Sequence, residues 1–390
     1  MCLRSGIDVR IITGKGKSEA HAWNIVKIGS YWYDVDTTWD EGYANVPSTK
    51  YFLIPHSEFL LDHTPDRKYT EKGFVNDHPM SEIRYCPPSF EKASLILGGK
   101  IGLNMMMNLP QLPEFDYDNS YMEFTVNGGE PIRQDYDPNR TNEDGTLFKF
   151  TCYVNSVQMA DDITAVFHYL ENGEEKQVSQ TYTVEQYLKS LSILGETAEA
   201  KALAKATGDY GYYIQPYLAE FNNWALEGED AAHKRMSFRN SSGYLNKISE
   251  ILDGIDLPDI TKTSDIRSLG ISLLLDSDTS LNLLIYTNKD YTGTVHAAID
   301  NKDVEAKKVS KGKYKVVIPN IGAASLDKKY SVVVTTDAGD TTINLSALNY
   351  VKIALSKTNP EATYNEKQAM GAIYYYAKAA KAYAAAQLDA

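Results

Sequence analysis

The strongest constraint on the fold is a segment that occurs twice in the chain. SLILGGKIGLNM, beginning at Ser94, aligns without a gap with SLLLDSDTSLNL, beginning at Ser272, and the two share serine, leucine and asparagine at equivalent positions. Each segment consists of apolar-rich runs around turn residues, which predicts a β-hairpin. A repeat of this kind indicates two related modules and is more typical of spacing or binding than of chemistry.

The segments after each repeated hairpin also follow one order, with strands first and helices last. In the first copy the strand-like runs include LFKFTCYV and ITAVFHYL, and in the second they include KYKVVIP and YSVVVTT. Helical periods then close both copies, at residues 184–191, 197–221, 346–356 and 366–387. We therefore expect residues 94–222 and 272–387 to share one strand order, each with helices packed on a sheet or sandwich.

Matching side chains support the repeat at its helical end. Tyr187 and Lys189 of the first copy correspond to Tyr350 and Lys352 of the second. Tyrosines also recur at helical spacing in the longer helix of the first copy, at Tyr210, Tyr213 and Tyr217. Such a stripe is more typical of a helix packing on a sheet than of ligand binding.

The length of 390 residues suggests two or three domains, at ~150 residues each. Proline residues punctuate the chain before the first repeated hairpin, so we place a boundary near residue 86. The predicted parts are an N-terminal part at 1–86, a β-rich module with C-terminal helices at 87–222, a linker at 223–264 with one short helix, and a second such module at 265–390.

The N-terminal part is organised around AHAWNIVKIGSYWYDVDTTWD, residues 20–40, which contains three of the four tryptophans. The apolar-rich NIVK, a Gly-Ser turn signal and the alternating YWYDV predict a β-hairpin. This hairpin places His21 at the start of one strand and Asp36 at the end of its partner. We therefore expect their side chains to lie within hydrogen-bond distance, about 2.6–3.2 Å.

His21 and Asp36 have the chemistry of a catalytic pair. A carboxylate beside an imidazole fixes its tautomer and stabilises its cation, which is the general-base half of a Cys-His-Asp or Ser-His-Asp site. The alternative is a polar bridge inside a hairpin, with no catalytic role.

Residues 6–40, GIDVRIITGKGKSEAHAWNIVKIGSYWYDVDTTWD, resemble the core of the transglutaminase-like superfamily, which includes bacterial cysteine proteases. In that family a His-Ala-Trp-Asn element follows a glycine-ended strand, and a Trp-Tyr pair precedes an Asp-x-Thr-Trp-Asp element. The resemblance implies a partial papain/transglutaminase-like α+β core, with His21 as the catalytic base and Asp36 as its orienting acid. Trp23 and Trp39 are interpreted as core or substrate-cleft residues.

The resemblance also implies a cysteine nucleophile at the start of a helix. Cys2 would lie in the last turn of that helix, just before Gly6. A thiolate is stabilised at a helix N-terminus and not at a C-terminus, so Cys2 is interpreted as a small buried residue. We therefore expect the nucleophile to precede Met1 in a longer protein, and the chain as given to be inactive.

The remaining chemistry-bearing residues indicate no cofactor and no metal. The three cysteines lack Cys-x-x-Cys spacing, so neither a zinc site nor a disulfide framework is indicated, although a Cys86–Cys152 bridge is left open. Asp62 and His63 are interpreted as a surface hydrogen-bonding pair and not as a metal site, at the start of a loop over residues 63–77.

Charge and hydropathy exclude two classes of partner. A net charge of −13 argues against a nucleic-acid or anionic-membrane partner, because neither attracts an acidic surface. The sequence has no apolar run of the length that a transmembrane helix needs, so membrane insertion is not expected.

Two functions fit these observations. The first is a secreted or cell-surface transglutaminase-like cysteine peptidase or amidase, acting by acyl transfer on a protein or peptide substrate at a cell wall or host surface. The two modules, which resemble C-terminal regions of large surface proteins of gut Firmicutes, would anchor or target it. The second is a non-catalytic adhesion or scaffold protein with a remnant transglutaminase-like fold. Both predict an extracellular or cell-surface location.

Overall fold

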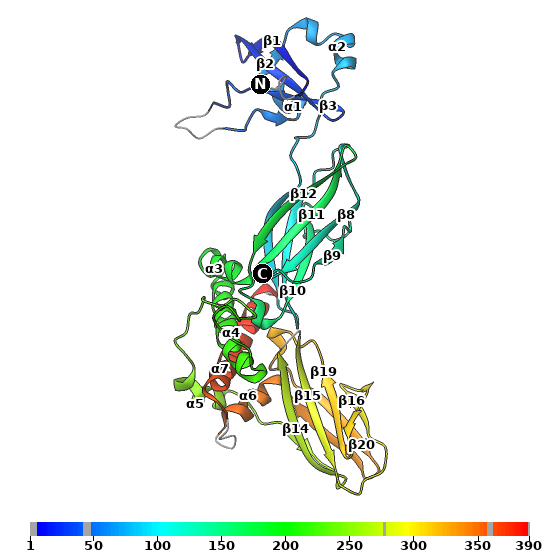
Figure 1. Cartoon of the computed structure of the whole chain (residues 1–390), viewed down its shortest axis with the longest axis vertical. Helices are drawn as coiled ribbons and strands as arrows, with labels where there is room; N and C mark the ends of the chain where they lie inside the picture. Colours follow the sequence, from blue (N-terminus) through cyan, green and yellow to red (C-terminus); the bar gives the residue numbers. More distant parts are fainter. Residues whose placement is uncertain (1–5, 42–47, 276–277, 357–361, 389–390) are drawn as a thin grey trace.

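Helices and strands in several sheets make the chain an α+β protein, as expected from the sequence. The computed structural model describes residues 6–41, 48–275, 278–356 and 362–388. Figure 1 shows an elongated molecule with an N-terminal sheet at one end, one β-rich module in the middle and a second at the other end. In the described part of the chain, no helix combines the length and apolar composition needed to cross a bilayer.

The N-terminal part is a five-stranded antiparallel sheet with the order β4-β3-β2-β1-β5. Its strands are β1 (Val9–Gly16), β2 (Glu19–Ile28), β3 (Tyr31–Val35), β4 (Phe52–Ile54) and β5 (His63–Pro65). The predicted hairpin is present as β2 and β3, in the register that pairs Asn24 with Val35. Gly29 occupies the turn between them with a φ of 56°, a conformation that favours glycine.

The expectation of a loop over residues 63–77 is wrong. This stretch contains β5, a 3₁₀ turn η2 (Arg67–Tyr69) and the short helix α2 (Lys72–Asp77), and α1 (His56–Phe59) lies just before it. β5 is only three residues long and pairs with the far end of β1, Lys15 opposite Thr64. A strand this short has no period of its own, so its pairing partner defines it and its sequence does not.

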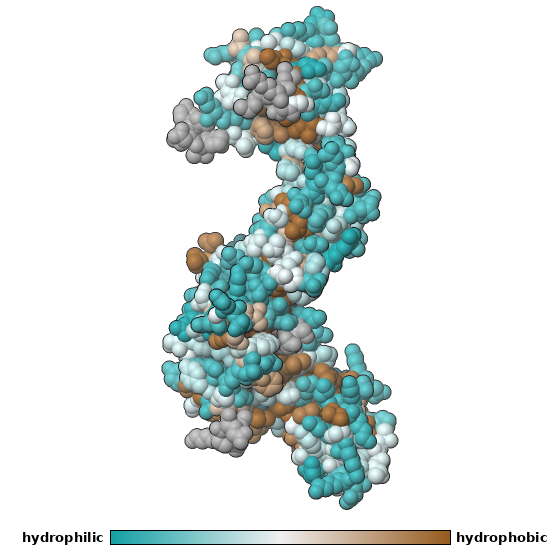
Figure 2. All heavy atoms as spheres, viewed as in Figure 1, coloured by the Kyte–Doolittle hydropathy of each residue, from teal (hydrophilic) through white to brown (hydrophobic). Residues whose placement is uncertain are grey.

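Two apolar clusters cover the two faces of the N-terminal sheet. One cluster contains the buried residues Ile12, Trp23, Ile25, Trp32, Tyr51, Ile54 and Phe59. The other contains Val26, Tyr33, Val35 and Leu53, with Tyr85 packed against it. Because successive side chains of a strand point to opposite faces, His21 lies on the same face as Trp23 and Ile25. In Figure 2, apolar residues are also visible on the surface of this part.

The first module is a pair of sheets followed by two helices. Its elements are β6 (Ser89–Ile96), β7 (Ile101–Asn108), β8 (Phe115–Val126), β9 (Ile132–Asp135), β10 (Phe148–Val154), η3 (Ser156–Gln158), β11 (Ile163–Glu171), β12 (Glu174–Tyr182), α3 (Val184–Leu194) and α4 (Ala198–Asn222). The strand orders are β10-β7-β6 and β12-β11-β8-β9.

The second module follows a linker that contains η4 (Leu245–Lys247) and α5 (Ile248–Asp253), so the expected short helix is present. The elements of the second module are β13 (Asp259–Thr261), β14 (Ile266–Leu275), β15 (Thr279–Thr287), β16 (His296–Ile299), β17 (Lys302–Val304), β18 (Lys307–Ser310), β19 (Lys313–Ile318), η5 (Ala323–Ser325), β20 (Tyr330–Thr336), β21 (Gly339–Leu345), α6 (Ala347–Leu355) and α7 (Tyr364–Leu388). The strand orders are β14-β15-β19-β18 and β13-β21-β20-β16-β17.

The two modules share one strand order, as the repeat predicts. β19-β15-β14 corresponds to β10-β7-β6, and β21-β20-β16-β17 corresponds to β12-β11-β8-β9, while β18 and β13 are additional edge strands. The aligned hairpin residues even make the same hydrogen bond. The Asn104 amide donates to the Ser94 hydroxyl at 2.9 Å, and the Asn282 amide donates to the Ser272 hydroxyl at 3.3 Å.

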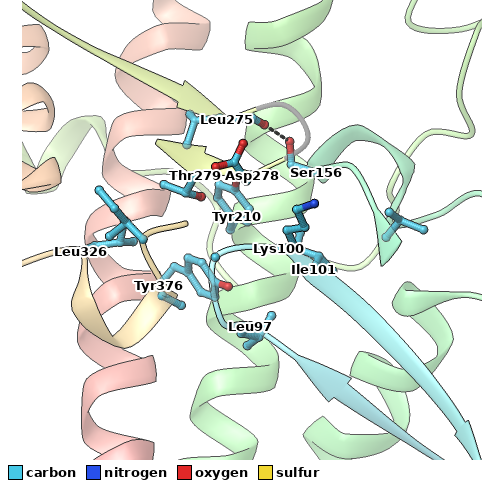
Figure 3. A pocket seen from close by; sticks show the side chains of 14 residues that line it. Leu97, Lys100, Ile101, Ser156, Tyr210, Leu275, Asp278, Thr279, Leu326 and Tyr376 are labelled. Carbon is cyan, nitrogen blue, oxygen red and sulfur yellow. Dashed lines mark hydrogen bonds between the residues drawn. The ribbon is translucent and has the colours of Figure 1, made fainter. Parts of the chain in front are cut away.

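The long helices α4 and α7 pack against each other between the modules (Figure 1). At their contact the rings of Tyr210 and Tyr376 stack with centroids 4.9 Å apart and planes 7° from parallel. Figure 3 shows the two tyrosines side by side in a junction lined from both modules. The cavity at this junction has a volume of only about 20 Å³. The junction is therefore a packed core and not a binding site.

The linker is packed onto both helices at equivalent points. Gly208 of α4 lies under the Phe238 ring, where an added Cβ would come within 2.5 Å of it, and Gly371 of α7 lies under Tyr244, at 2.3 Å. These glycines let the linker backbone and aromatic rings approach the helices closely. The linker thus closes the contact between the modules instead of separating them.

Candidate active site

His21 and Asp36 lie together at the end of the β2–β3 hairpin. His21 is in β2 and Asp36 directly follows β3, and the imidazole Nε2 lies 2.6 Å from the carboxylate Oδ2. The predicted hydrogen bond is therefore present. The His21 side chain is 15% exposed and the Asp36 side chain 1%, so the imidazole is the accessible partner.

Asp36 is held as a carboxylate by several donors. Its Oδ1 accepts hydrogen bonds from the backbone N–H groups of Thr38 at 3.0 Å and Trp39 at 3.2 Å. Burial by itself would raise the pKa of Asp36, but hydrogen bonds from His21, His63 and the Trp39 backbone outweigh it and lower the pKa. A fixed, ionised carboxylate of this kind orients the imidazole that donates to it.

The two candidate cleft tryptophans differ in their positions. Trp39 is partly exposed, and its ring stacks on the His21 ring with centroids 5.2 Å apart and planes 25° from parallel. Trp23 is buried, and its indole N–H donates to Asp34 Oδ1 at 3.2 Å. Trp39 therefore holds the imidazole in place from one side, whereas Trp23 belongs to the core of the sheet.

His63 is a third member of the site, and its interpretation as a surface residue is wrong. The His63 ring is buried, with Nε2 3.1 Å from Asp36 Oδ2 and Nδ1 2.7 Å from Asp62 Oδ1. It also stacks on Phe59 at a centroid distance of 3.9 Å. The pairing of β5 with β1 turns His63 inward, and no periodicity in the sequence signals that pairing. The one available signal is the adjacent Asp62, which fixes the ring.

A second histidine–aspartate pair lies beside this site. His56 Nδ1 is 2.7 Å from Asp34 Oδ2. Burial raises the pKa of Asp34 and outweighs the hydrogen bonds from His56 and Trp23. Burial would lower the pKa of His56, but the hydrogen bond and charge of Asp34 raise it.

A groove of about 500 Å³ runs along the same face of the sheet. Its apolar lining includes Ile12, Trp23, Ile25, Leu60, Phe74 and Met80. Asp34, His56 and His63 contribute polar groups to it. His63 is thus the member of the site that lines this apolar groove, which is large enough to hold side chains of a further segment or ligand.

Neither described cysteine belongs to this site. Cys86 accepts a hydrogen bond from Asn108 of β7, and burial raises the pKa of its thiol. Cys152 is buried in β10, and burial raises its pKa to about 12. Both are free thiols, so the Cys86–Cys152 bridge that the sequence left open is not formed. Cys2 lies outside the described residues.

The geometry thus joins His21, Asp36 and His63 and places Trp39 against the imidazole, while Trp23 packs in the core and also lines the groove. No protein-family model matches this chain, and no curated protein matches it by sequence.

Proposed function

We propose that this chain carries the general-base half of a transglutaminase-like acyl-transfer site, which acts on amide bonds of a protein or peptide at the cell surface. The observation that carries the proposal is the 2.6 Å contact between His21 Nε2 and the ionised Asp36. With Nε2–H donated to Asp36, the lone pair lies on Nδ1, for which no partner occurs among the described residues. That nitrogen is placed to accept the proton of a nucleophile.

The chemistry follows from this arrangement. A cysteine thiol gives its proton to His21 Nδ1, and Asp36 stabilises the imidazolium that forms. The thiolate attacks the amide carbonyl, and the imidazolium then protonates the leaving amine. Water releases the acyl group as an acid, and an amine releases it as a crosslink. In this proposal the cysteine comes from a segment outside these 390 residues, and the apolar groove beside the site fits the side chains of such a segment.

The test is an activity-based thiol probe applied to this chain and to a form extended upstream in its parent protein. We expect labelling only in the extended form, and its loss in His21→Ala, because the imidazole generates the thiolate. Losing one member of such a triad costs on the order of 10⁴–10⁶ in rate. His296→Ala, at an exposed position in β16, is the matched histidine control and should leave labelling intact.

Labelling of Cys2 in the given chain, abolished by His21→Ala, would contradict the assignment of the nucleophile. Labelling in neither form would favour the second candidate, a non-catalytic surface scaffold. One observation favours that candidate. The two repeated modules are joined through packed helices into an extended body, as a spacer or scaffold requires.

A further inference from the structure

We propose that His21, His63 and Asp36 form a binding site for Zn²⁺ or a similar divalent transition-metal ion. One potential ligand atom from each of these three residues lies within 4.8 Å of the other two, and the Nε2 atoms of both histidines face Asp36 Oδ2. They come from β2, from β5 and from the residue that follows β3. Three neighbouring parts of the N-terminal sheet thus bring three potential ligand atoms close together.

The hydrogen bonds of His63 provide the first argument. Its Nδ1 faces Asp62 Oδ1 and its Nε2 faces Asp36 Oδ2, and an ionised carboxylate accepts hydrogen bonds but donates none. With Nδ1 held by Asp62, Nε2 is the nitrogen of the buried ring that can bind a metal ion beside the Asp36 carboxylate. The carboxylates of Asp36 and Asp62 on either side of this buried ring also provide negative charge that attracts a cation.

The groups around the three ligands provide the second argument. Asp62 fixes His63 at Nδ1, and the Tyr51 hydroxyl in turn donates to Asp62 Oδ2 at 2.7 Å. The Oδ1 atom of Asp36 accepts hydrogen bonds from two backbone N–H groups, so Oδ2 is the oxygen that would bind the metal ion. Metal-binding histidines in proteins are oriented by just such carboxylates on the other ring nitrogen.

The ligand set selects the metal. Two imidazole nitrogens and one carboxylate oxygen suit Zn²⁺, with water in the fourth tetrahedral position, whereas Mg²⁺ and Ca²⁺ prefer oxygen ligands. Ligand bonds of about 2.1 Å place tetrahedral donors about 3.4 Å apart. The present contacts of 2.6 and 3.1 Å must therefore open slightly on binding, and the His21 side chain, 15% exposed against 0% for His63, is the less confined of the two.

Metal binding and the proposed acyl transfer exclude each other. A metal ion on His21 Nε2 replaces the proton that Asp36 accepts, so the remaining proton lies on Nδ1 and that atom cannot act as a base. This consequence rests on the proposed function. The binding itself does not, so the two can be tested separately.

The experiment is a titration of the full chain, stripped with a chelator, with Zn²⁺ by calorimetry and with Co²⁺ by visible absorption. We expect one strong site, with the intense Co²⁺ spectrum of tetrahedral coordination. His63→Ala and His21→Gln should remove it, and Asp62→Asn should weaken it about 10–100-fold. His296→Ala, outside the cluster, should bind as the parent does, and Mg²⁺ should not compete.

Unchanged binding in His21→Gln, or equal loss in His296→Ala, would overturn the proposal. Circular dichroism identifies any variant that fails to fold, and His21→Gln, at the partly exposed position, serves where His63→Ala does not fold. Zinc binding without thiol labelling of the extended form would support the metal site and reject the acyl-transfer function. Thiol labelling without zinc binding would support the acyl-transfer function and reject the metal site.

Discussion

Asp36 receives two imidazole and two backbone N–H groups, so its charge has structural as well as chemical consequences. Its pKa is lower in the folded chain than the ordinary value of 3.8. Folding therefore favours the carboxylate, and this stabilisation is fully present above the unfolded pKa and is lost as the pH falls through the folded pKa.

We expect Asp36→Asn to destabilise the N-terminal part by about 3–5 kcal/mol at pH 7, because buried donors lose their charged partner. The difference between variant and parent should begin to shrink below about pH 4 and disappear only below the lowered folded pKa, where the parent carboxyl is itself protonated. Urea unfolding followed by tryptophan fluorescence, at pH 7 and in acid, measures the destabilisation and its decrease at low pH. Asp77→Asn, at an exposed position, is the control. A difference that is independent of pH would contradict the ionised state of Asp36.

At the scale of elements, glycines set how closely the linker approaches the helices. Gly371→Ala would place a Cβ 2.3 Å from the Tyr244 Cβ, so the linker must move away from α7. We expect the free energy of unfolding of the modules to fall by about 1–3 kcal/mol, the usual destabilisation from overpacking a core. Gly73→Ala in α2 is the matched helical control, since nothing lies within 4 Å of its added Cβ.

Chemical unfolding followed by circular dichroism compares these two glycine variants. Gly73→Ala should be neutral or slightly stabilising, because alanine favours a helix more than glycine does. Equal effects of the two variants would show that the linker contact contributes nothing to the stability of the modules.

At the scale of the whole molecule, the Tyr210–Tyr376 stack joins the two modules. Both rings are buried, so replacing either tyrosine by alanine should lower the free energy of unfolding by about 3–5 kcal/mol. A double-mutant cycle of Tyr210→Ala and Tyr376→Ala should give a coupling energy of about 0.5–1.5 kcal/mol. Purely additive effects would mean that the modules do not share this contact in solution.

The N-terminal part provides an internal control for that cycle. Three of the four tryptophans lie in it, so tryptophan fluorescence mainly reports its unfolding. It meets the first module through a small contact, in which the Tyr85 hydroxyl donates to Glu171 at 2.7 Å. We therefore expect the tyrosine variants to shift the circular-dichroism transition of the modules and to leave the main fluorescence transition in place.

Local sequence determined the parts of this protein that depend on neighbouring residues. The β2–β3 hairpin follows from its alternation and its turn, and its period of two places His21 and Asp36, 15 residues apart, on one face. The two modules follow from the repeated hairpins, because similar segments followed by elements in the same order form corresponding strands. Their common strand order, down to the Asn–Ser hydrogen bonds, confirms this.

Tertiary structure alone decided the position of His63 and the contact between the modules. His63 lies 27 residues from Asp36 on a three-residue strand, which exists only because the edge of β1 pairs with it. Tyr210 belongs to a tyrosine stripe that predicted packing, but its partner on α7 depends on how two distant helices meet. Periodicity records which face of an element is buried, and it carries no information on which distant element covers that face.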